Sequence, residues 1–254
     1  MSKNTQWVLG NHAVSAVLNK SPERVVSVYA VANNSNKKNT NKMQQSLLTL
    51  VEQLGLGINY TDKASLNKQC GSEHHQGIAL QVIPKQTLTE NDLDAFIAAI
   101  QSPFLLILDQ IQDPHNLGAC IRTADAAGID ALVMAKDNTA PISPVVQKVA
   151  SGAVESLTIF KVTNLARAIE KIKTLGVWVI GTSDRATESL YQQKLDGPIA
   201  IVMGSEGKGL RSLTEKKCDA LVRLPMASDV VSSLNVSVAT GVCLYEVVRQ
   251  RSLI

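Results

Sequence analysis

Polar side chains and glycines gather in three short stretches of the chain, each directly after an apolar run that predicts a buried strand. In the first stretch, residues 108–128 (LDQIQDPHNLGACIRTADAAG), Asn116 and Arg122 stand in a segment otherwise rich in small residues. An amide donates and accepts hydrogen bonds, and a guanidinium offers a planar fork of donors for phosphate or ribose oxygens. Six residues separate them, so they need not share a helix face, yet both can reach the end of the strand. A lone arginine can also be an ordinary surface residue, and its position after a strand makes Arg122 a candidate.

The second stretch, residues 199–210 (IAIVMGSEGKGL), carries glycines at positions 204, 207 and 209 with Glu206 among them. Glycines let the backbone approach a ligand closely. Their spacing fits neither the dinucleotide fingerprint nor a phosphate-binding P-loop, which disfavours a nicotinamide dehydrogenase. Glu206 would present its carboxylate to whatever binds there.

The third stretch, residues 224–246 (LPMASDVVSSLNVSVATGVCLYE), passes from a short strand through small polar residues into a helix. Residues 226–233 contain no large aromatic side chain, so their backbone groups are free to face a ligand. Ser233 and Asn235 fall at the first helical turn, where a side-chain oxygen can cap the helix. The spacing predicts one buried stripe on this helix, made of Leu234, Val238, Val242 and Tyr245.

The elements that would position these stretches alternate between strands and helices. Strands are predicted at residues 104–108, 131–135, 157–160, 177–182, 200–203 and 220–224, with helices between them such as 165–175. This alternation predicts an α/β fold with a parallel sheet and helices on both faces. In such sheets ligands bind beyond the carboxyl ends of the strands, where the three stretches begin.

The N-terminal third predicts a smaller α/β unit, residues 1–82. It should contain an entry segment and short helix at residues 7–18, a strand at 24–31, a helix at 43–54 and a strand at 77–82. The Asn- and Lys-rich residues 33–42 are too polar to pack in a core, and predict a loop that is disordered without RNA or faces RNA. A linker and connecting helix fill residues 83–102, where Thr89 and Asp92 resemble a capping box and the helix ends near Ile100.

Charge is unevenly distributed along the chain, although the net charge is only +3. Residues 1–85 hold nine Lys/Arg and four Asp/Glu, whereas residues 86–254 hold sixteen and eighteen. A basic first third suggests contact with a polyanion such as nucleic acid; the alternative is a solvated lysine face. No apolar run is long enough for a membrane span and no signal peptide is evident, so we expect a cytoplasmic protein without membrane contact.

Cysteine and histidine usage argues against a metal site. The four cysteines lie in separate segments without a C-x-x-C pair, which favours free thiols over disulfides or zinc. His74 and His75 are adjacent and have no nearby cysteine or carboxylate ligand in sequence.

Taken together, the three stretches resemble the three motifs of the SpoU (TrmH-like) branch of the SPOUT methyltransferases. The Asn and Arg of the first motif are Asn116 and Arg122. The second motif, M-G-x-E-G-x-G, is residues 203–209, and the third is residues 224–226 with 232–239, including Ser232. No motif position departs from the family pattern. The resemblance covers residues 103–254, and the N-terminal third resembles the ribosomal-protein-L30-like substrate-binding domain of the ribosomal-RNA members.

The resemblance implies a SPOUT domain at residues 103–254 with a parallel sheet and a deep trefoil knot, and a homodimer. It implies transfer of a methyl group from S-adenosylmethionine, without metal, to the ribose 2′-oxygen of a guanosine in the peptidyl-transferase region of large-subunit (23S) ribosomal RNA. Cofactor contacts carry over to Gly204, Leu224 and Leu234, with neighbouring Met203 and Met226.

The resemblance also assigns catalytic roles. Arg122 becomes the catalytic residue, acting through a proton path or by stabilising the developing alkoxide. Asn116 and Glu206 would orient Arg122 or the RNA, and Ser233 and Asn235 would fix the loop and contact substrate.

Two rival functions remain open at this point. A transfer-RNA ribose 2′-O-methyltransferase would share the motifs, but such members typically lack the N-terminal domain. A catalytically silent RNA-binding protein would keep the basic N-terminal unit and break the motifs, whereas Asn116, Arg122, Glu206 and Asn235 are all present.

Overall fold

The computed structural model describes residues 5–32, 42–228, 230 and 233–252. Residues 33–41 of the predicted polar loop, and Ser232 of the third motif, lie outside these ranges. The chain divides into two compact units: Met1–Gln86 with Ser151–Ser156, and Thr87–Ala150 with Leu157–Ile254. Each unit is described by itself.

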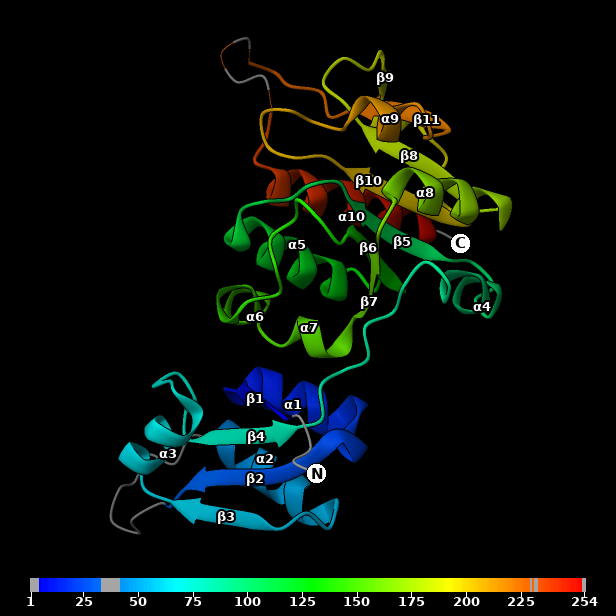
Figure 1. Ribbon diagram of the computed structural model, residues 1–254. Helices are drawn as coiled ribbons and strands as arrows, with labels where there is room; N and C mark the ends of the chain where they lie inside the picture. The colour runs from blue at the N-terminus through cyan, green and yellow to red at the C-terminus, as the bar shows by residue number, and fades with distance from the viewer. Residues whose placement is uncertain (1–4, 33–41, 229, 231–232, 253–254) are drawn as a thin grey trace. The chain divides into compact units, whose positions relative to one another are not determined.

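The first unit is built on a four-stranded sheet with the order β1-β4-β2-β3 (Figure 1). Strand β4 pairs antiparallel with both β1 and β2, and β2 pairs parallel with β3. Its elements along the chain are β1 (Gln6–Leu9), α1 (Asn11–Lys20), the 3-10 helix η1 (Pro22–Arg24), β2 (Val25–Val31), α2 (Lys42–Gln53), β3 (Ile58–Thr61), α3 (Lys63–Cys70) and β4 (Ile78–Val82). Helices α1 and α2 close the core with fully buried Val14, Val17 and Val51.

The predicted entry segment at residues 7–18 is in part a strand. Trp7 lies in β1, where it faces the ring of Tyr29 at 5.2 Å between centroids. Gly10, with a positive φ of 86°, turns the chain from β1 directly into α1. Pairing with β4, a contact that sequence periodicity does not reveal, makes residues 6–9 a strand.

The second unit contains a seven-stranded sheet in the order β7-β6-β5-β10-β8-β11-β9, in which every pairing is parallel. Its strands are β5 (Phe104–Leu108), β6 (Ala131–Ala135), β7 (Thr158–Val162), β8 (Trp178–Thr182), β9 (Glu188–Ser189), β10 (Ile199–Met203) and β11 (Ala220–Arg223). Its helices are α4 (Leu93–Ala98), α5 (Pro114–Ala126), α6 (Pro144–Ala150), α8 (Leu165–Thr174), η2 (Leu190–Gln192), α9 (Ser212–Glu215) and α10 (Val236–Arg251). Helix α7 (Ala153–Ser156) is grouped with the first unit. The predicted parallel α/β sheet is confirmed.

Helices cover both faces of this sheet. One face packs alternate strand residues, for example Leu105 and Ile107, against α4 and α8. The opposite face is covered by α5, which packs against both α6 and α10 (Figure 1). Strands β5, β6 and β10 are buried at every position, which explains their continuous apolar sequences. Within the described part of the chain, no helix is long and apolar enough to cross a membrane.

Thr89 and Asp92 are hydrogen-bonded to each other, but the helix does not begin at Thr89 as predicted. The helix begins later, at Leu93, after a turn closed by the bond from the Asp92 backbone N–H to the Thr89 carbonyl. Asp92 accepts hydrogen bonds from the backbone and hydroxyl of Thr89, at 2.8 and 3.0 Å. One residue earlier, Leu88 forms a bridge with Phe160 of β7. That extended pairing keeps the chain from entering a helix at Thr89.

The stripe predicted to be buried on α10 faces outward. Val238 and Tyr245 are 53% and 50% exposed, and Leu234 precedes the helix. Val242 of the stripe is half-buried, and the buried positions of the helix are Val236, Thr240, Cys243, Leu244, Glu246 and Val247. The helix is apolar on two sides, and periodicity could not determine which side meets the core of its own chain.

Candidate active site

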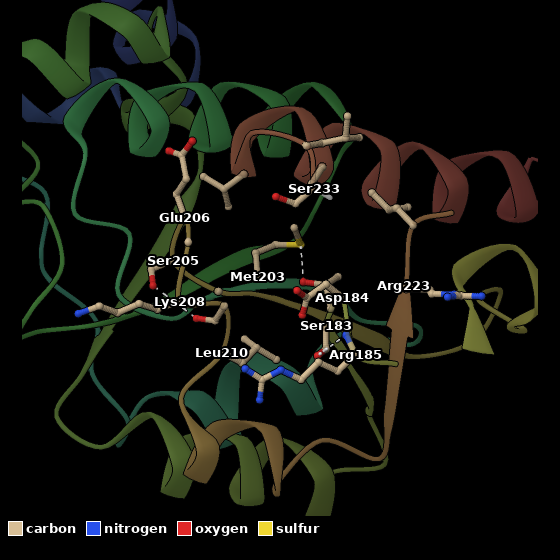
Figure 2. Close-up of a pocket in the computed structure, with 18 of the residues that line it drawn as sticks. Ser183, Asp184, Arg185, Met203, Ser205, Glu206, Lys208, Leu210, Arg223 and Ser233 are labelled. Carbon is tan, nitrogen blue, oxygen red and sulfur yellow. Dashed lines mark hydrogen bonds between the residues drawn. The ribbon is translucent and has the colours of Figure 1, made fainter. Parts of the chain in front are cut away.

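A pocket lies at the edge where β8, β10 and β11 end, which we call the carboxyl edge of the sheet (Figure 2). Its wall consists of residues 182–185, 203–210 and 222–224, with Glu215, Met226, Ser233, Leu234, Val236 and Ala239. Three separate chain segments therefore meet at one cavity. Parallel strands end together, so the three loops that follow them are brought side by side.

The glycine-rich loop after β10 closes on itself. Ser205 and Gly209 exchange two backbone hydrogen bonds of 3.1 and 2.9 Å, and Gly207 and Gly209 both have positive φ. Gly204 has no room for a side chain, because a Cβ atom there would lie 2.2 Å from the carbonyl carbon of Gly209. The tight loop lifts Glu206 toward α5, as Figure 2 shows.

A hydrogen-bonded chain links one residue from each of the three motifs. The side-chain amide of Asn235 donates to the side-chain oxygen of Asn116 at 3.0 Å, and the Asn116 amide donates to the Glu206 carboxylate at 3.0 Å. Asn116 is 90 positions from Glu206 and 119 from Asn235 in sequence. The fold thus fixes the direction in which the Glu206 carboxylate points, and leaves its other oxygen available to a ligand.

Helix starts position this hydrogen-bonded chain. Asp113 caps α5 by accepting from the Asn116 backbone at 2.7 Å, with Pro114 as the first helical residue. Asn235 caps α10 by accepting from the Ser237 backbone at 2.9 Å. The predicted cap at this helix is therefore Asn235, whereas Ser233 lies before the helix and lines the pocket.

Packing between α5 and α10 brings the two caps together. The Cys120 thiol of α5 lies 3.4 Å from the Thr240 hydroxyl of α10, and both side chains are fully buried. Burial raises the pKa of the Cys120 thiol to about 11. This thiol stays protonated at neutral pH and serves packing, not nucleophilic chemistry.

Arg122 stands apart from the pocket. It is exposed on α5, does not line the cavity, and its guanidinium has no hydrogen bond or ion pair to any described residue. Asn116 and Arg122 both lie in α5 but on different faces, as a six-residue separation requires. Within one copy of the protein, Asn116, Glu206 and Asn235 therefore come together without Arg122.

The five residues predicted to hold the cofactor all line this one pocket: Met203, Gly204, Leu224, Met226 and Leu234. Glu206 and Ser233 line it as well, and Asn116 and Asn235 join it through the hydrogen bonds described above.

Sequence reasoning missed the residues that follow β8 and the support behind the glycine loop. Ser183, Asp184 and Arg185 line the pocket, and the predicted strand at 177–182 was a signal that could have found them. The fully buried Asp109 accepts from the backbone and side chain of Arg211, at 3.1 and 2.7 Å. This ion pair anchors the end of the glycine loop to the end of β5.

The profile of the SpoU rRNA Methylase family matches residues 103–245, and the chain belongs to this family. Residues 7–88 match the profile described as RNA 2'-O ribose methyltransferase substrate binding.

Curated relatives match almost the whole chain. The 23S rRNA (guanosine-2'-O-)-methyltransferase RlmB of Haemophilus influenzae is 47% identical over 248 residues, covering 97% of this chain and 98% of its own. The enzyme of the same name from Pasteurella multocida is 48% identical over 252 residues, 99% of each chain. The SpoU methyltransferase AviRb from Streptomyces viridochromogenes, solved with AdoMet, has the same fold with a TM-score of 0.77 at 21% identity, covering 98% of this chain and 91% of that one.

The pocket fits S-adenosylmethionine in its chemistry. Buried Met203, Val222 and Val236 offer apolar walls to an adenine ring, and the backbone groups at the strand ends offer donors and acceptors. Asp184 and Glu206 supply negative charge and Arg185 supplies positive charge, which suits a ligand with a sulfonium, an ammonium and a carboxylate. Among the described residues, no group of three or more His, Cys, Asp or Glu is arranged to hold a metal ion.

Proposed function

We propose that this protein transfers a methyl group from S-adenosylmethionine to the ribose 2′-oxygen of a guanosine in 23S ribosomal RNA, in the peptidyl-transferase region. The observation that carries the proposal is the convergence of all three motifs on one pocket, joined by the Asn235–Asn116–Glu206 chain. Similarity to the RlmB enzymes over nearly the full length of both proteins supports the substrate class.

The residues of the pocket would hold the methyl donor and the ribose in line. When bound, S-adenosylmethionine supplies an electrophilic methyl group on a sulfonium. The 2′-oxygen would form the new bond to the methyl carbon as the sulfur–carbon bond breaks, and the hydroxyl proton would pass to water or to a phosphate oxygen of the RNA. Met203, Gly204, Leu224, Met226 and Leu234 would contact the donor, while Ser233 and Asn235 fix the loop beside it. Asn116 and Glu206 would orient the RNA by hydrogen bonds whose geometry is set before substrate arrives.

Arg122 would stabilise the oxygen as its negative charge develops. A guanidinium remains protonated at neutral pH, so stabilisation of an alkoxide is chemically easier for it than removal of a proton. Since Arg122 lies outside the pocket of its own chain, we infer that it acts in the pocket of a second copy.

A homodimer would accomplish this. Val238 and Tyr245 of α10 are half exposed, so the described part of the chain leaves this apolar side of the helix incompletely covered. A second copy that packs on this surface would bury its apolar side chains. Helix α5, which carries Arg122, packs beside α10 and would therefore lie near the same interface.

The N-terminal unit would bind the RNA. Its profile match and its excess of five positive charges over residues 1–85 support this role. We keep the division into residues 1–82, a linker at 83–102 and a catalytic domain at 103–254, together with the trefoil knot, as part of the proposal. A protein acting on ribosomal RNA would work in the cytoplasm.

Methyl transfer to RNA tests the proposal directly. Purified protein and labelled S-adenosylmethionine are incubated with unmodified 23S ribosomal RNA or with unmodified transfer RNA, and 2′-O-methyl sites are mapped in ribosomal RNA from cells with and without the gene. We expect label at one guanosine ribose of 23S RNA, and loss of that site without the gene. Label found only in transfer RNA would overturn the substrate, and label in neither RNA would leave a binding protein.

A further inference from the structure

Two more cavities lie along the carboxyl edge of the sheet, on the side of β6 and β7. One, of about 420 Å³, contains Lys136 and Lys161 in its wall. The other, of about 310 Å³, contains Arg211. The two share Ala135 and Thr163, and Arg211 follows Leu210 of the pocket described above. The three hollows therefore follow one another along a single edge, and we call the two new ones together the edge groove.

Unpaired positive charge marks the edge groove. The ammonium groups of Lys136 and Lys161 have no hydrogen bond or ion pair to any described residue. The charge of Arg211 is paired with Asp109 through its Nε, while its terminal nitrogens have no partner among the described residues and 44% of the side chain is exposed. Surface cations in this unit are often neutralised, as Lys171 is by Asp94 and Lys173 by Asp219. The walls also contain the carboxylates of Glu90 and Asp137, so the cations left for a ligand are Lys136 and Lys161.

The floor of the groove suits a nucleoside. Met134, Ala135 and Ala140 are almost fully buried and give an apolar base. The Thr139 hydroxyl is buried and has no partner among the described residues. The Glu90 carboxylate in the same wall is already engaged, since it accepts from the Thr163 backbone at 3.3 Å, and its pKa lies below the usual value because of backbone hydrogen bonds. It stays ionised, so one negative charge stands in the same wall as the two lysines, and no ion pair joins it to either of them among the described residues.

The separation of the two sites also fits one ligand. The edge groove lies near β6 and β7, and the pocket lies near β10 and β8. These two places are three strand spacings apart, about 14 Å at ~4.8 Å per strand. Figure 2 shows the Lys208 side chain extending from the glycine loop away from the centre of the pocket. A polyanion lying along this edge would meet cations at both ends of that distance.

We propose that the edge groove holds the single-stranded RNA that flanks the methylated nucleotide, with phosphates on Lys136 and Lys161 and a base over Met134 and Ala140. The proposal rests on the proposed function, because it assumes an RNA substrate in the neighbouring pocket. It assigns RNA binding to the catalytic unit in addition to the N-terminal unit.

The test replaces the two lysines by an uncharged residue of similar length. We compare Lys136→Gln/Lys161→Gln with a control, Lys194→Gln/Lys216→Gln, which removes two exposed lysines outside all three cavities. Binding of full-length protein to unmodified 23S RNA is measured from low to moderate salt. Losing two phosphate contacts should lower the slope of log K against log salt by about 1.4, and weaken binding roughly tenfold near physiological salt.

Kinetics and crosslinking complete the test. The groove variant should raise KM for RNA with kcat and S-adenosylmethionine affinity close to wild type. A 23S RNA fragment carrying photoreactive uridines next to the target should crosslink to peptides containing residues 134–141 or 161–163. RNA affinity and salt slope equal to those of the control pair, or crosslinks confined to other peptides, would overturn the groove. If the wild-type protein methylates no RNA, the proposed function itself fails, and this result is distinct from either outcome.

Discussion

At the scale of single residues, Asn235 has two duties that can be separated by substitution. Its oxygen caps α10, and its amide nitrogen donates to Asn116. Asn235→Asp keeps the capping oxygen and loses the donor, so the free energy of unfolding should stay within a few tenths of a kcal/mol while single-turnover methyl transfer falls roughly tenfold. Asn235→Ala should lose the rate and also about 1 kcal/mol of stability. Chemical denaturation and rapid-quench assays on both variants provide the check; an Asp variant with full activity would remove Asn235 from the site.

Arg122 gives a sharper prediction, because the structure keeps it away from the pocket of its own chain. Arg122→Lys retains the charge but replaces a fixed planar fork with one flexible ammonium. We expect a loss on the order of 100- to 1000-fold in single-turnover rate, with cofactor affinity and fold unchanged. Cofactor titration and methyl transfer on the same preparation measure both quantities. Turnover within a few-fold of wild type would show that fork geometry is irrelevant, whereas lost cofactor binding would place Arg122 in the donor site.

The identities of these residues were predictable from motif spacing, but their contacts were not. Asn116, Glu206 and Asn235 could be named because each follows a strand in a recognisable pattern. Their mutual hydrogen bonds depend on how α5 packs on α10. These two helices are far apart in sequence, so no local sequence pattern predicts their contact. The Asp109–Arg211 pair escaped for the same reason, since neither residue carries a motif of its own.

At the scale of elements, α10 shows where a hydrophobic pattern leaves a question open. Both of its sides are apolar, and the stripe with the regular spacing is the one left exposed. The strands were easier to predict, since short continuous apolar runs such as residues 104–108 are typical of strands in a sheet covered on both faces. Helix starts depended on tertiary pairing, as the shift from Thr89 to Leu93 illustrates.

The exposed stripe of α10 makes a prediction about assembly. Val238→Glu/Tyr245→Glu should convert a dimer into a monomer, because burying two unpaired carboxylates at an interface is costly. The unfolding free energy of each chain should change little, since both side chains are already half exposed in the single chain. Sedimentation at micromolar concentration reports the mass, and Val145→Glu, at a 43% exposed site on α6, is the control. A wild-type protein that sediments as a fully active monomer would contradict the prediction.

At the scale of the whole molecule, the two units have separate hydrophobic cores. Removing residues 1–86 should therefore leave S-adenosylmethionine binding within a few-fold of wild type and weaken RNA binding, with a smaller salt dependence. Calorimetric titration with the cofactor and RNA binding at several salt concentrations measure the two effects. RNA affinity that survives truncation unchanged would place recognition wholly in the second unit.

The order of the seven strands could not be predicted from the sequence, because the alternation of strands and helices predicts parallel pairing but not which strands become neighbours.

The pairing of β5 with β10 has a consequence for biosynthesis. Phe104 of β5 lies beside Ile199 of β10, and no other strand can occupy that side of β5 in the finished sheet. During translation at about 5–20 residues per second, β5 emerges roughly 5 to 20 seconds before its neighbour exists. Throughout that interval the apolar edge FLLIL is open to pairing with other nascent chains. Strand β10, which leads into the glycine loop of the pocket, is thus also the strand whose late synthesis leaves the edge of β5 uncovered.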